Sequence, residues 1–423
     1  MRKRILFVGE AVSLAHVTRP LVLAQGLDPE RYEVHFGCGP RYREIIEAAG
    51  FPVHDLPVQP PEQFFRNLYA GKPGYSEETL RQYMRAELRL LARLSPDLVA
   101  ADTRFSLAIS CKLAGIPYAT LINAHWSPHY ALGFPVPDLP ITRFFGERLV
   151  RMIMPLALPI SLRRMAEPCN RLRRGVGLPA LAGLHEVYCH GDWTLYFDIP
   201  ELSPTSSLPP NHRYIGPALW EPEMEMPAWR RFLKTGARRA YVTMGSSGND
   251  RVTLAAVEAL RRLGCEVMVS TNEPLPWTAA EGVFSAPVLP GLKAAALADI
   301  VVCHGGSGTI YQALAKGVPV LGLCVNADQQ LVMQGVESAG AGIGFLARKA
   351  TPRSIAEAAG RLLGEARYRE SALRLSKRIA ESSAPRAFAA FVEEALGPAG
   401  RNFRADVDTA AAHRAGVRGG SAS

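Results

Sequence analysis

The stretch VVCHGGSGTIYQALAKGVPVLGLCVNADQQ, residues 301–330, decides the fold because two apolar runs in it enclose a glycine-rich turn and a helical segment. The runs at 300–303 and 318–324 are short and rich in Val and Leu, which is typical of buried parallel strands joined by a helix. Ligands of open α/β sheets bind at the carboxyl ends of the strands. The sequence therefore predicts a ligand site in the turn at 304–309.

The turn, HGGSGT, has the chemistry of a phosphate-binding loop. A helix N-terminus offers free N–H groups and roughly half a positive charge to an anion. Three glycines allow close backbone approach, while His304, Ser307 and Thr309 add polar donors. The alternative is a turn that only serves tight packing, with His304 hydrogen-bonded in the core. The turn is neither a Walker A nor a GxGxxG loop, and no GxSxG elbow occurs, which disfavours an NTPase, a dehydrogenase or a serine hydrolase.

The same alternation of short apolar runs and helical periods fills both halves of the chain. We expect an α/β protein of two Rossmann-like, doubly wound parallel-sheet domains that face a central cleft. The N-terminal domain is expected at 1–216 and the C-terminal domain at 238–397. A Pro-rich linker spans 217–237, and the small, polar residues of 398–423 predict a disordered tail.

Composition and cysteine usage favour a cytoplasmic globular protein. The chain has 423 residues, 48% of them apolar, which suffices for two cored domains. Its seven cysteines are scattered and never in CxxC spacing, which argues against a disulfide framework or a structural zinc site. The apolar run at 5–8 is too short for a secretory signal.

The net charge of +9 is compatible with nucleic acid, anionic lipid or a phosphorylated small molecule as partner. The basic residues are spread over many helices without an aromatic stacking stripe, so nucleic acid is the partner we disfavour most. The segment 149–165 combines apolar residues with arginines and prolines. We expect buried helix packing there, and peripheral contact of residues 141–164 with the inner face of a membrane is the alternative.

The order of motifs from VLPGLKAAALADIVVCHGGSGT to GAGIGF, residues 288–345, resembles the donor-binding signature of family-one, UDP-glycosyltransferase-like enzymes. The resemblance covers roughly residues 4–395 and is close to the bacterial macrolide and antibiotic glycosyltransferases. It implies a GT-B fold and an inverting, metal-independent transfer of a hexosyl group without a cofactor. The donor would be a UDP- or dTDP-sugar, and the acceptor a hydroxyl of a small apolar natural product or lipid.

The resemblance also assigns the donor site. The two glycine-rich turns would hold the diphosphate, the backbone at 288–289 would meet the base, and an Asp-Gln pair would take the sugar hydroxyls. The donor-site residues are Gly245, Ser246, Val288, Leu289, His304, Gly306, Ser307, Gly308, Thr309, Asp328 and Gln329. For Asp328, an N-cap of the following helix is the alternative.

Two N-terminal residues would carry the chemistry. In the family, a His after the first strand removes the acceptor's proton and an Asp orients it, which here implies His16 and Asp102. Both follow parallel strands and so reach one sheet edge, where a carboxylate stabilises the imidazolium that forms. The sequence departs from the family in Ala15 and in Pro20, which follows at four positions instead of three. Core packing or capping is the alternative for His16, and a helix N-cap for Asp102.

His125 and Trp126 follow a further strand and are expected in the wall of the acceptor pocket. A metal pair of His125 and His129 is disfavoured because Pro128 prevents a regular helix and no third ligand lies nearby in the sequence. Plain core packing is the alternative.

Two rival functions stay open. A nucleotide-sugar epimerase of the same fold would share the diphosphate site, but it needs acids and bases around the donor sugar, where only Asp328 is placed clearly. A non-catalytic sugar-nucleotide-binding protein would have lost its base. The presence of His16 and Asp102 argues against this function. The sequence leaves the sugar, the nucleobase, the acceptor and the oligomeric state open.

Overall fold

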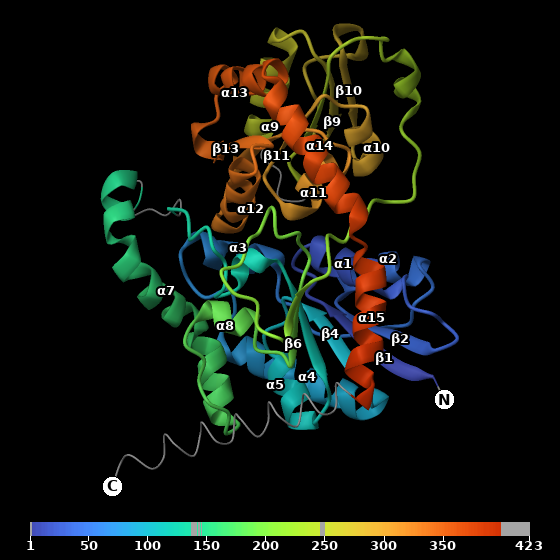
Figure 1. Ribbon diagram of the computed structural model, residues 1–423, viewed down its shortest axis with the longest axis vertical. Coiled ribbons are helices and arrows are strands. Elements are labelled where there is room, and N and C mark those ends of the chain that lie inside the picture. The colour runs from blue at the N-terminus through green and yellow to red at the C-terminus, as the bar shows by residue number, and fades with distance from the viewer. Residues whose placement is uncertain (1, 137–141, 143, 145, 246–249, 399–423) are drawn as a thin grey trace.

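The structure is a computed structural model that describes residues 2–136, 142, 144, 146–245 and 250–398. Two parallel sheets, of seven and six strands, form two α/β domains, and Figure 1 shows the N-terminal domain below the C-terminal one. The predicted fold of two doubly wound parallel-sheet domains is therefore confirmed. Within the described residues, no helix is long and apolar enough to cross a membrane.

The N-terminal sheet has the order β3-β2-β1-β4-β5-β6-β7, with all neighbours parallel. Its strands are β1 Lys3–Gly9, β2 Tyr32–Cys38, β3 Val53–Asp55, β4 Leu98–Asp102, β5 Tyr118–Ile122, β6 Trp193–Tyr196 and β7 His212–Tyr214. Its helices are α1 Ala15–Ala24, α2 Arg43–Ala48, α3 Pro61–Tyr69, α4 Glu77–Leu94, α5 Leu107–Ala114, α7 Glu147–Gly175 and α8 Leu184–Tyr188. The central strands β1 and β4 are almost fully buried because helices cover both faces of the sheet.

The C-terminal sheet has the order β10-β9-β8-β11-β12-β13, again all parallel. Its strands are β8 Arg239–Thr243, β9 Glu266–Ser270, β10 Val283–Ala286, β11 Ile300–Cys303, β12 Val320–Cys324 and β13 Gly342–Leu346. The helices that follow are α9 Asp250–Arg262, α10 Gly291–Ala296, α11 Ser307–Ala315, α12 Ala327–Ser338, α13 Pro352–Gly364, α14 Ala366–Glu381 and α15 Ala384–Leu396. Thr351 caps α13 through a capping box, as the Thr-Pro start predicts.

Each sheet reverses its winding once, and this positions the site. The reversals lie between β1 and β4 and between β8 and β11, where the loops leave in opposite directions and open a crevice. Gly9 is paired with Asp102 in the first sheet, and Cys303 with Thr243 in the second. The predicted catalytic residues and the predicted phosphate turn thus leave from the two switch points of the molecule.

The chain crosses between the domains twice. The first crossing follows β7, and the second lies between α14 and α15; Figure 1 shows α15 against the N-terminal domain. Phe388 and Phe391 of α15 are buried in the N-terminal core, where the Phe388 ring lies 5.3 Å from that of Phe7. The expected range of the C-terminal domain, 238–397, therefore ends in a helix that packs in the other domain.

One expectation for the segment between β5 and β6 is corrected. The segment 149–165 does not form a buried helix, because only the later part of α7 packs against α4 and α8. In its first half, Met152 is 72%, Leu156 78% and Ile160 59% exposed. The strand β7, of three residues, pairs at the sheet edge just before the expected linker at 217–237.

Candidate functional site

One cavity of about 950 Å³ joins the two domains and is lined by both switch-point loops. His16 and Thr103 line it from the N-terminal side, and His304 and the first turn of α11 from the C-terminal side. A site of this size suits a ligand or ligand pair much larger than a single sugar ring.

On the N-terminal side, His16 and Asp102 are in contact. His16 lies in the first turn of α1, and its Nδ1 is 2.8 Å from Oδ1 of Asp102, the fully buried last residue of β4. Thr103 follows with a left-handed φ of 58° and donates its hydroxyl to the same oxygen at 2.9 Å. With Nδ1–H directed at the carboxylate, Nε2 is the ring atom left to accept a proton from a ligand.

Sequence reasoning missed a third member of this cluster, Arg19. Its Nε donates to Oδ2 of Asp102 at 2.7 Å and its Nη2 to Oδ1 at 2.8 Å, a bidentate pair buried against the ring of Phe197. The signal was present, since Arg19 lies three positions after His16 and therefore on the same face of α1. Arg19 also donates to Asn123, which extends the cluster to the end of β5.

The charge of Asp102 is held by these partners. Burial alone would raise the pKa of the Asp102 carboxyl, but the positive charge of Arg19 and the hydrogen bonds from His16 and Thr103 outweigh it and lower the pKa below its usual range. The carboxylate therefore stays ionised at neutral pH. Asp102 is not the N-cap of α5, which is Ser106.

A series of hydrogen bonds connects this cluster to α11, the helix that follows the predicted phosphate turn. Asn123 donates to Asp198 at 3.0 Å, and the hydroxyl of Tyr311 on α11 donates to the same carboxylate at 2.9 Å. Asn123 and Asp198 belong to the N-terminal domain and Tyr311 belongs to the C-terminal domain. The two halves of the cavity therefore share one hydrogen-bonded network.

On the C-terminal side, α11 begins at the cavity. Its N-cap is Gly306, which has no side chain, and no hydrogen bond from a side chain of the described residues caps the helix. The N–H groups of the first turn, at Ser307, Gly308 and Thr309, therefore lie at the cavity as donors for an anion. A Cβ added at Gly308 would meet nothing within 4 Å, which leaves that side of the turn open.

The glycines around His304 are required by its ring. A Cβ at Gly306 would lie 2.4 Å from the ring Nε2, and one at Gly245 would lie 2.7 Å from Cε1. Burial lowers the pKa of His304 to about 4, against the opposite effect of the Asp328 charge. The imidazole is therefore neutral at pH 7 and one of its nitrogens carries an N–H donor. Ser246, the partner of Gly245 in the expected turn, lies outside the described residues.

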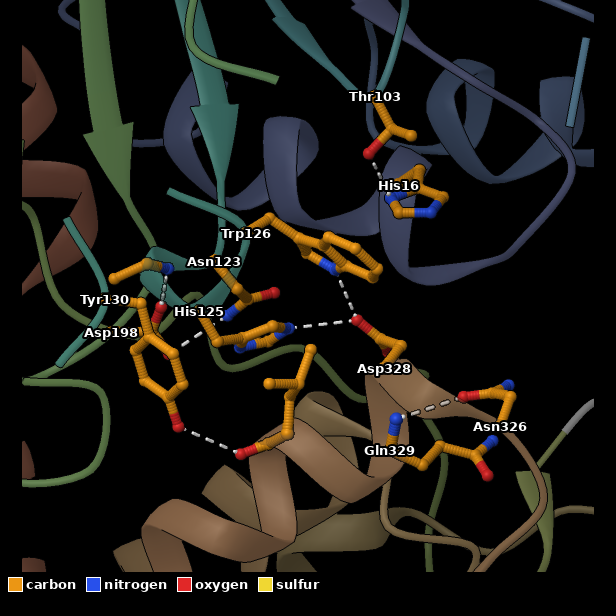
Figure 2. Close-up of polar contacts among 12 residues, drawn as sticks. His16, Thr103, Asn123, His125, Trp126, Tyr130, Asp198, Asn326, Asp328 and Gln329 are labelled. Atoms are coloured by element: carbon orange, nitrogen blue, oxygen red, sulfur yellow. Dashed lines mark hydrogen bonds and ion pairs between the residues drawn. The ribbon is translucent and has the colours of Figure 1, made fainter. Parts of the chain in front are cut away.

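Asp328 lies in the first turn of α12, but the N-cap of that helix is Asn326. Figure 2 shows His125 and Trp126 directed at the Asp328 carboxylate from across the domain boundary; their Nε2 and Nε1 atoms lie 2.9 and 2.7 Å from its Oδ1. Burial would raise the pKa of Asp328, but these hydrogen bonds lower it well below its usual range. The carboxylate is thus ionised and held at the cavity wall.

The remaining predicted residues divide into two groups. Val288, Leu289, Gln329 and Trp126 line the cavity, whereas the His125 side chain is buried behind the wall and reaches Asp328. His129 bonds to Ser207 instead of joining His125, and the described residues contain no group of three or more potential metal-ligating side chains.

The part of the cavity beyond His16 is apolar. Its walls come from α3, α7, α8 and the loop after β5, through Phe64, Leu68, Met154, Leu158, Phe134 and Tyr188. Their arrangement gives the N-terminal half of the cavity room for an apolar ligand next to His16.

Comparison with known proteins identifies the fold and the family of the chain. Residues 257–395 match the family model of the erythromycin biosynthesis protein CIII-like C-terminal domain. The spinosyn rhamnosyltransferase SpnG complexed with thymidine diphosphate shares the fold, with a TM-score of 0.69 and 20% identity over 93% of this chain and 100% of that one. The two facing domains and the central cavity define a glycosyltransferase of the GT-B fold.

Two mycobacterial relatives place the chain further. A PGL/p-HBAD biosynthesis glycosyltransferase of Mycobacterium tuberculosis is 43% identical over 384 residues, which cover 89% of this chain and 88% of the relative. A PGL/p-HBAD biosynthesis rhamnosyltransferase of Mycobacterium bovis is 44% identical over 378 residues, 89% of this chain and 84% of the relative. The chain belongs to the same glycosyltransferase family as these enzymes.

Proposed function

We propose that the protein transfers a rhamnosyl or related hexosyl group from a dTDP-sugar to a hydroxyl of a phenolic lipid acceptor, with inversion and without a metal ion. The relatives support this choice, since one of them is named a rhamnosyltransferase of PGL/p-HBAD biosynthesis and a solved structure of the same fold holds thymidine diphosphate. The apolar N-terminal half of the cavity supports a lipid acceptor.

The reaction follows from the placement of the groups. The diphosphate lies on the N-terminus of α11, where the free N–H groups, the helix dipole and His304 stabilise the charge that develops on the leaving group. Nε2 of His16 accepts the proton of the acceptor hydroxyl. The acceptor oxygen attacks the anomeric carbon while the bond between that carbon and the phosphate oxygen breaks. The products are the glycoside and dTDP. Asp102 stabilises the imidazolium.

The observation that carries this proposal is the His16–Asp102 contact at one side of the cavity that has the α11 turn on its other side. A base and a phosphate site that face one another across a cavity match a displacement at the carbon between them. Asp328 and Gln329 line the same cavity and would bind the sugar hydroxyls.

A transfer assay with the purified protein tests the proposal. Wild type, His16→Ala and the control His54→Ala, which alters a histidine outside the cavity lining, are incubated with dTDP-rhamnose or UDP-glucose and a phenolic lipid, in EDTA. His16→Ala should lower kcat by about 10²- to 10⁴-fold, the usual contribution of a general base. Full activity of His16→Ala, or loss of wild-type transfer in EDTA, would contradict the mechanism.

The same assay separates the rival functions. A changed sugar nucleotide formed without acceptor supports the epimerase, and nucleotide binding without any reaction supports the non-catalytic protein. The preferred donor decides between rhamnose and another hexose.

A further inference from the structure

Helix α7 is apolar on two opposite faces. One face lines the cavity through Val150, Met154, Ala157, Leu158 and Leu162. The other face is exposed, and its apolar side chains are Leu149, Met152, Leu156 and Ile160, while Ile153 lies at the border and also lines the cavity. With 3.6 residues per turn, positions 149, 152, 156 and 160 form one continuous stripe, because they recur three and four residues apart.

The outward stripe is unusual for a helix in contact with water alone. A surface helix normally directs its single apolar stripe at the core and exposes charged residues on the other side. Here the inward face already lies on the cavity, and Figure 1 shows the first half of α7 extending along the margin of the molecule. Clustered exposed apolar side chains of this size mark an interaction surface.

The charges on α7 indicate the chemistry of the partner. Arg148 precedes the stripe, Arg163 and Arg164 follow its end, and all three side chains are exposed. The sequence from 148 to 164 contains no Asp or Glu. An apolar stripe bordered by arginines is complementary to the interface of a bilayer that carries anionic lipids.

We propose that the outward face of α7, residues 149–160 with Arg163 and Arg164, docks on an anionic bilayer surface. The apolar side chains insert among the acyl chains near the headgroups, and the arginines contact lipid phosphates. The opposite face of the same helix then forms a wall between the bilayer surface and the acceptor half of the cavity. A lipid acceptor would enter the cavity beside α7 from the membrane. This part of the inference rests on the proposed function.

Vesicle cosedimentation tests the docking. The full-length protein is mixed with phosphatidylcholine vesicles with and without phosphatidylglycerol, as wild type, Met152→Asp/Leu156→Asp, and the control Leu113→Asp/Leu208→Asp. The control changes side chains that are 45% and 48% exposed on other elements. We expect the α7 variant to bind anionic vesicles at least about tenfold more weakly than wild type, since its two charges replace inserted apolar side chains. The control should bind like wild type.

The arginines are tested separately. Arg163→Ala/Arg164→Ala should weaken binding to anionic vesicles by about 25-fold, with about fivefold from each arginine near the surface, and should reduce its salt dependence. Arg262→Ala/Arg353→Ala, on the C-terminal domain, is the charge-matched control and should not change binding. Equal binding of the α7 variants and their controls overturns the proposal, and so does a wild-type dimer in light scattering that the α7 variant abolishes.

Transfer assays keep this inference distinct from the proposed function. Met152→Asp/Leu156→Asp should glycosylate a short water-soluble acceptor as wild type does and lose activity only on an acceptor embedded in vesicles. Vesicle binding without transfer to either acceptor refutes the proposed function alone. Transfer to the soluble acceptor without α7-dependent vesicle binding refutes the docking alone.

Discussion

At the scale of single residues, Asp102 is the centre of the hydrogen-bonded cluster that we propose to be catalytic. Its carboxylate accepts hydrogen bonds from His16, Arg19 and Thr103 while fully buried. The resemblance to family-one glycosyltransferases implies His16 and Asp102, and the predicted strands bring both residues to the same sheet edge. For Arg19 the local signal is its position three residues after His16, but an arginine on a helix is usually solvated and its burial depends on Asp102 and Asn123, which are distant in the chain.

We expect Arg19→Met to destabilise the protein by about 3–5 kcal/mol, because it leaves a buried carboxylate without its main counter-charge. The pKa of Asp102 should rise, and transfer activity should fall more steeply as the pH is lowered. Urea unfolding and a pH–rate profile measure both effects. In Arg19→Met/Asp102→Asn the buried charge is gone, so most of the stability should return while activity stays low. A double variant no more stable than Arg19→Met would contradict this account.

At the scale of elements, the strand–turn–helix unit of β11 and α11 is the part of the site that the local sequence predicts best. Its strand, glycine turn and helix lie within 300–315, so no distant contact is needed to form it. The contact of His125 and Trp126 with Asp328 joins residues about 200 positions apart and depends on how the two domains face each other. No local pattern could predict it, and the acceptor-wall assignment of His125 missed it.

Gly306 and Gly308, in the turn before α11 and in its first turn, differ in the space around them and should respond differently to a change to alanine. Gly306→Ala should lower stability by about 1–3 kcal/mol, because its Cβ would overlap the His304 ring. Gly308→Ala has no such neighbour and should leave the unfolding midpoint unchanged. Its methyl group would project beside the first-turn N–H groups, so we expect about tenfold weaker binding of a nucleoside diphosphate.

Calorimetry and titration with the nucleotide distinguish the two variants. If Gly308→Ala binds the nucleotide like wild type, the diphosphate does not approach this side of the turn.

At the scale of the whole molecule, α15, which follows the C-terminal sheet in the chain, belongs to the first domain. Phe388 of α15 is fully buried in the N-terminal core, whereas Ile379 of α14, nine positions earlier, is buried in the C-terminal core. The amphipathic pattern of a terminal helix predicts that it packs but does not say on which sheet. This is why the sequence assigns residues up to 397 to the C-terminal domain.

Two truncations of buried side chains should each destabilise a different domain. Phe388→Ala should cost about 3–5 kcal/mol and Ile379→Ala about 2–5 kcal/mol. Hydrogen exchange should show faster opening of β1 and β2 in the first variant and of the C-terminal sheet in the second. Loss of protection in the C-terminal sheet of Phe388→Ala, with β1 and β2 unaffected, would contradict the packing of α15.

Buried neutral histidines make the whole molecule sensitive to acid. Burial lowers the pKa of His185, His212 and His304 to about 4 and that of His190 to about 3. As the pH falls below about 6.5, the unfolded chain binds protons that the folded chain does not, so stability falls by up to about 1.4 kcal/mol per pH unit for each histidine. The melting temperature should therefore drop between pH 6.5 and 4.5. His190→Gln should flatten this slope, and an unchanged slope would show that His190 does not contribute.

The two crossings of the chain between the domains also determine how the cleft can move. Gly216 has a φ of 84°, and a Cβ there would lie 2.7 Å from Oγ of Ser382, so the outgoing and returning segments touch. Because two covalent connections lie side by side, we expect the domains to rotate about this point and not to slide past one another. Displacement of the cavity walls would then grow with distance from Gly216. A substitution that fills the space at Gly216 would change the rate of substrate exchange without touching a single atom of the cavity.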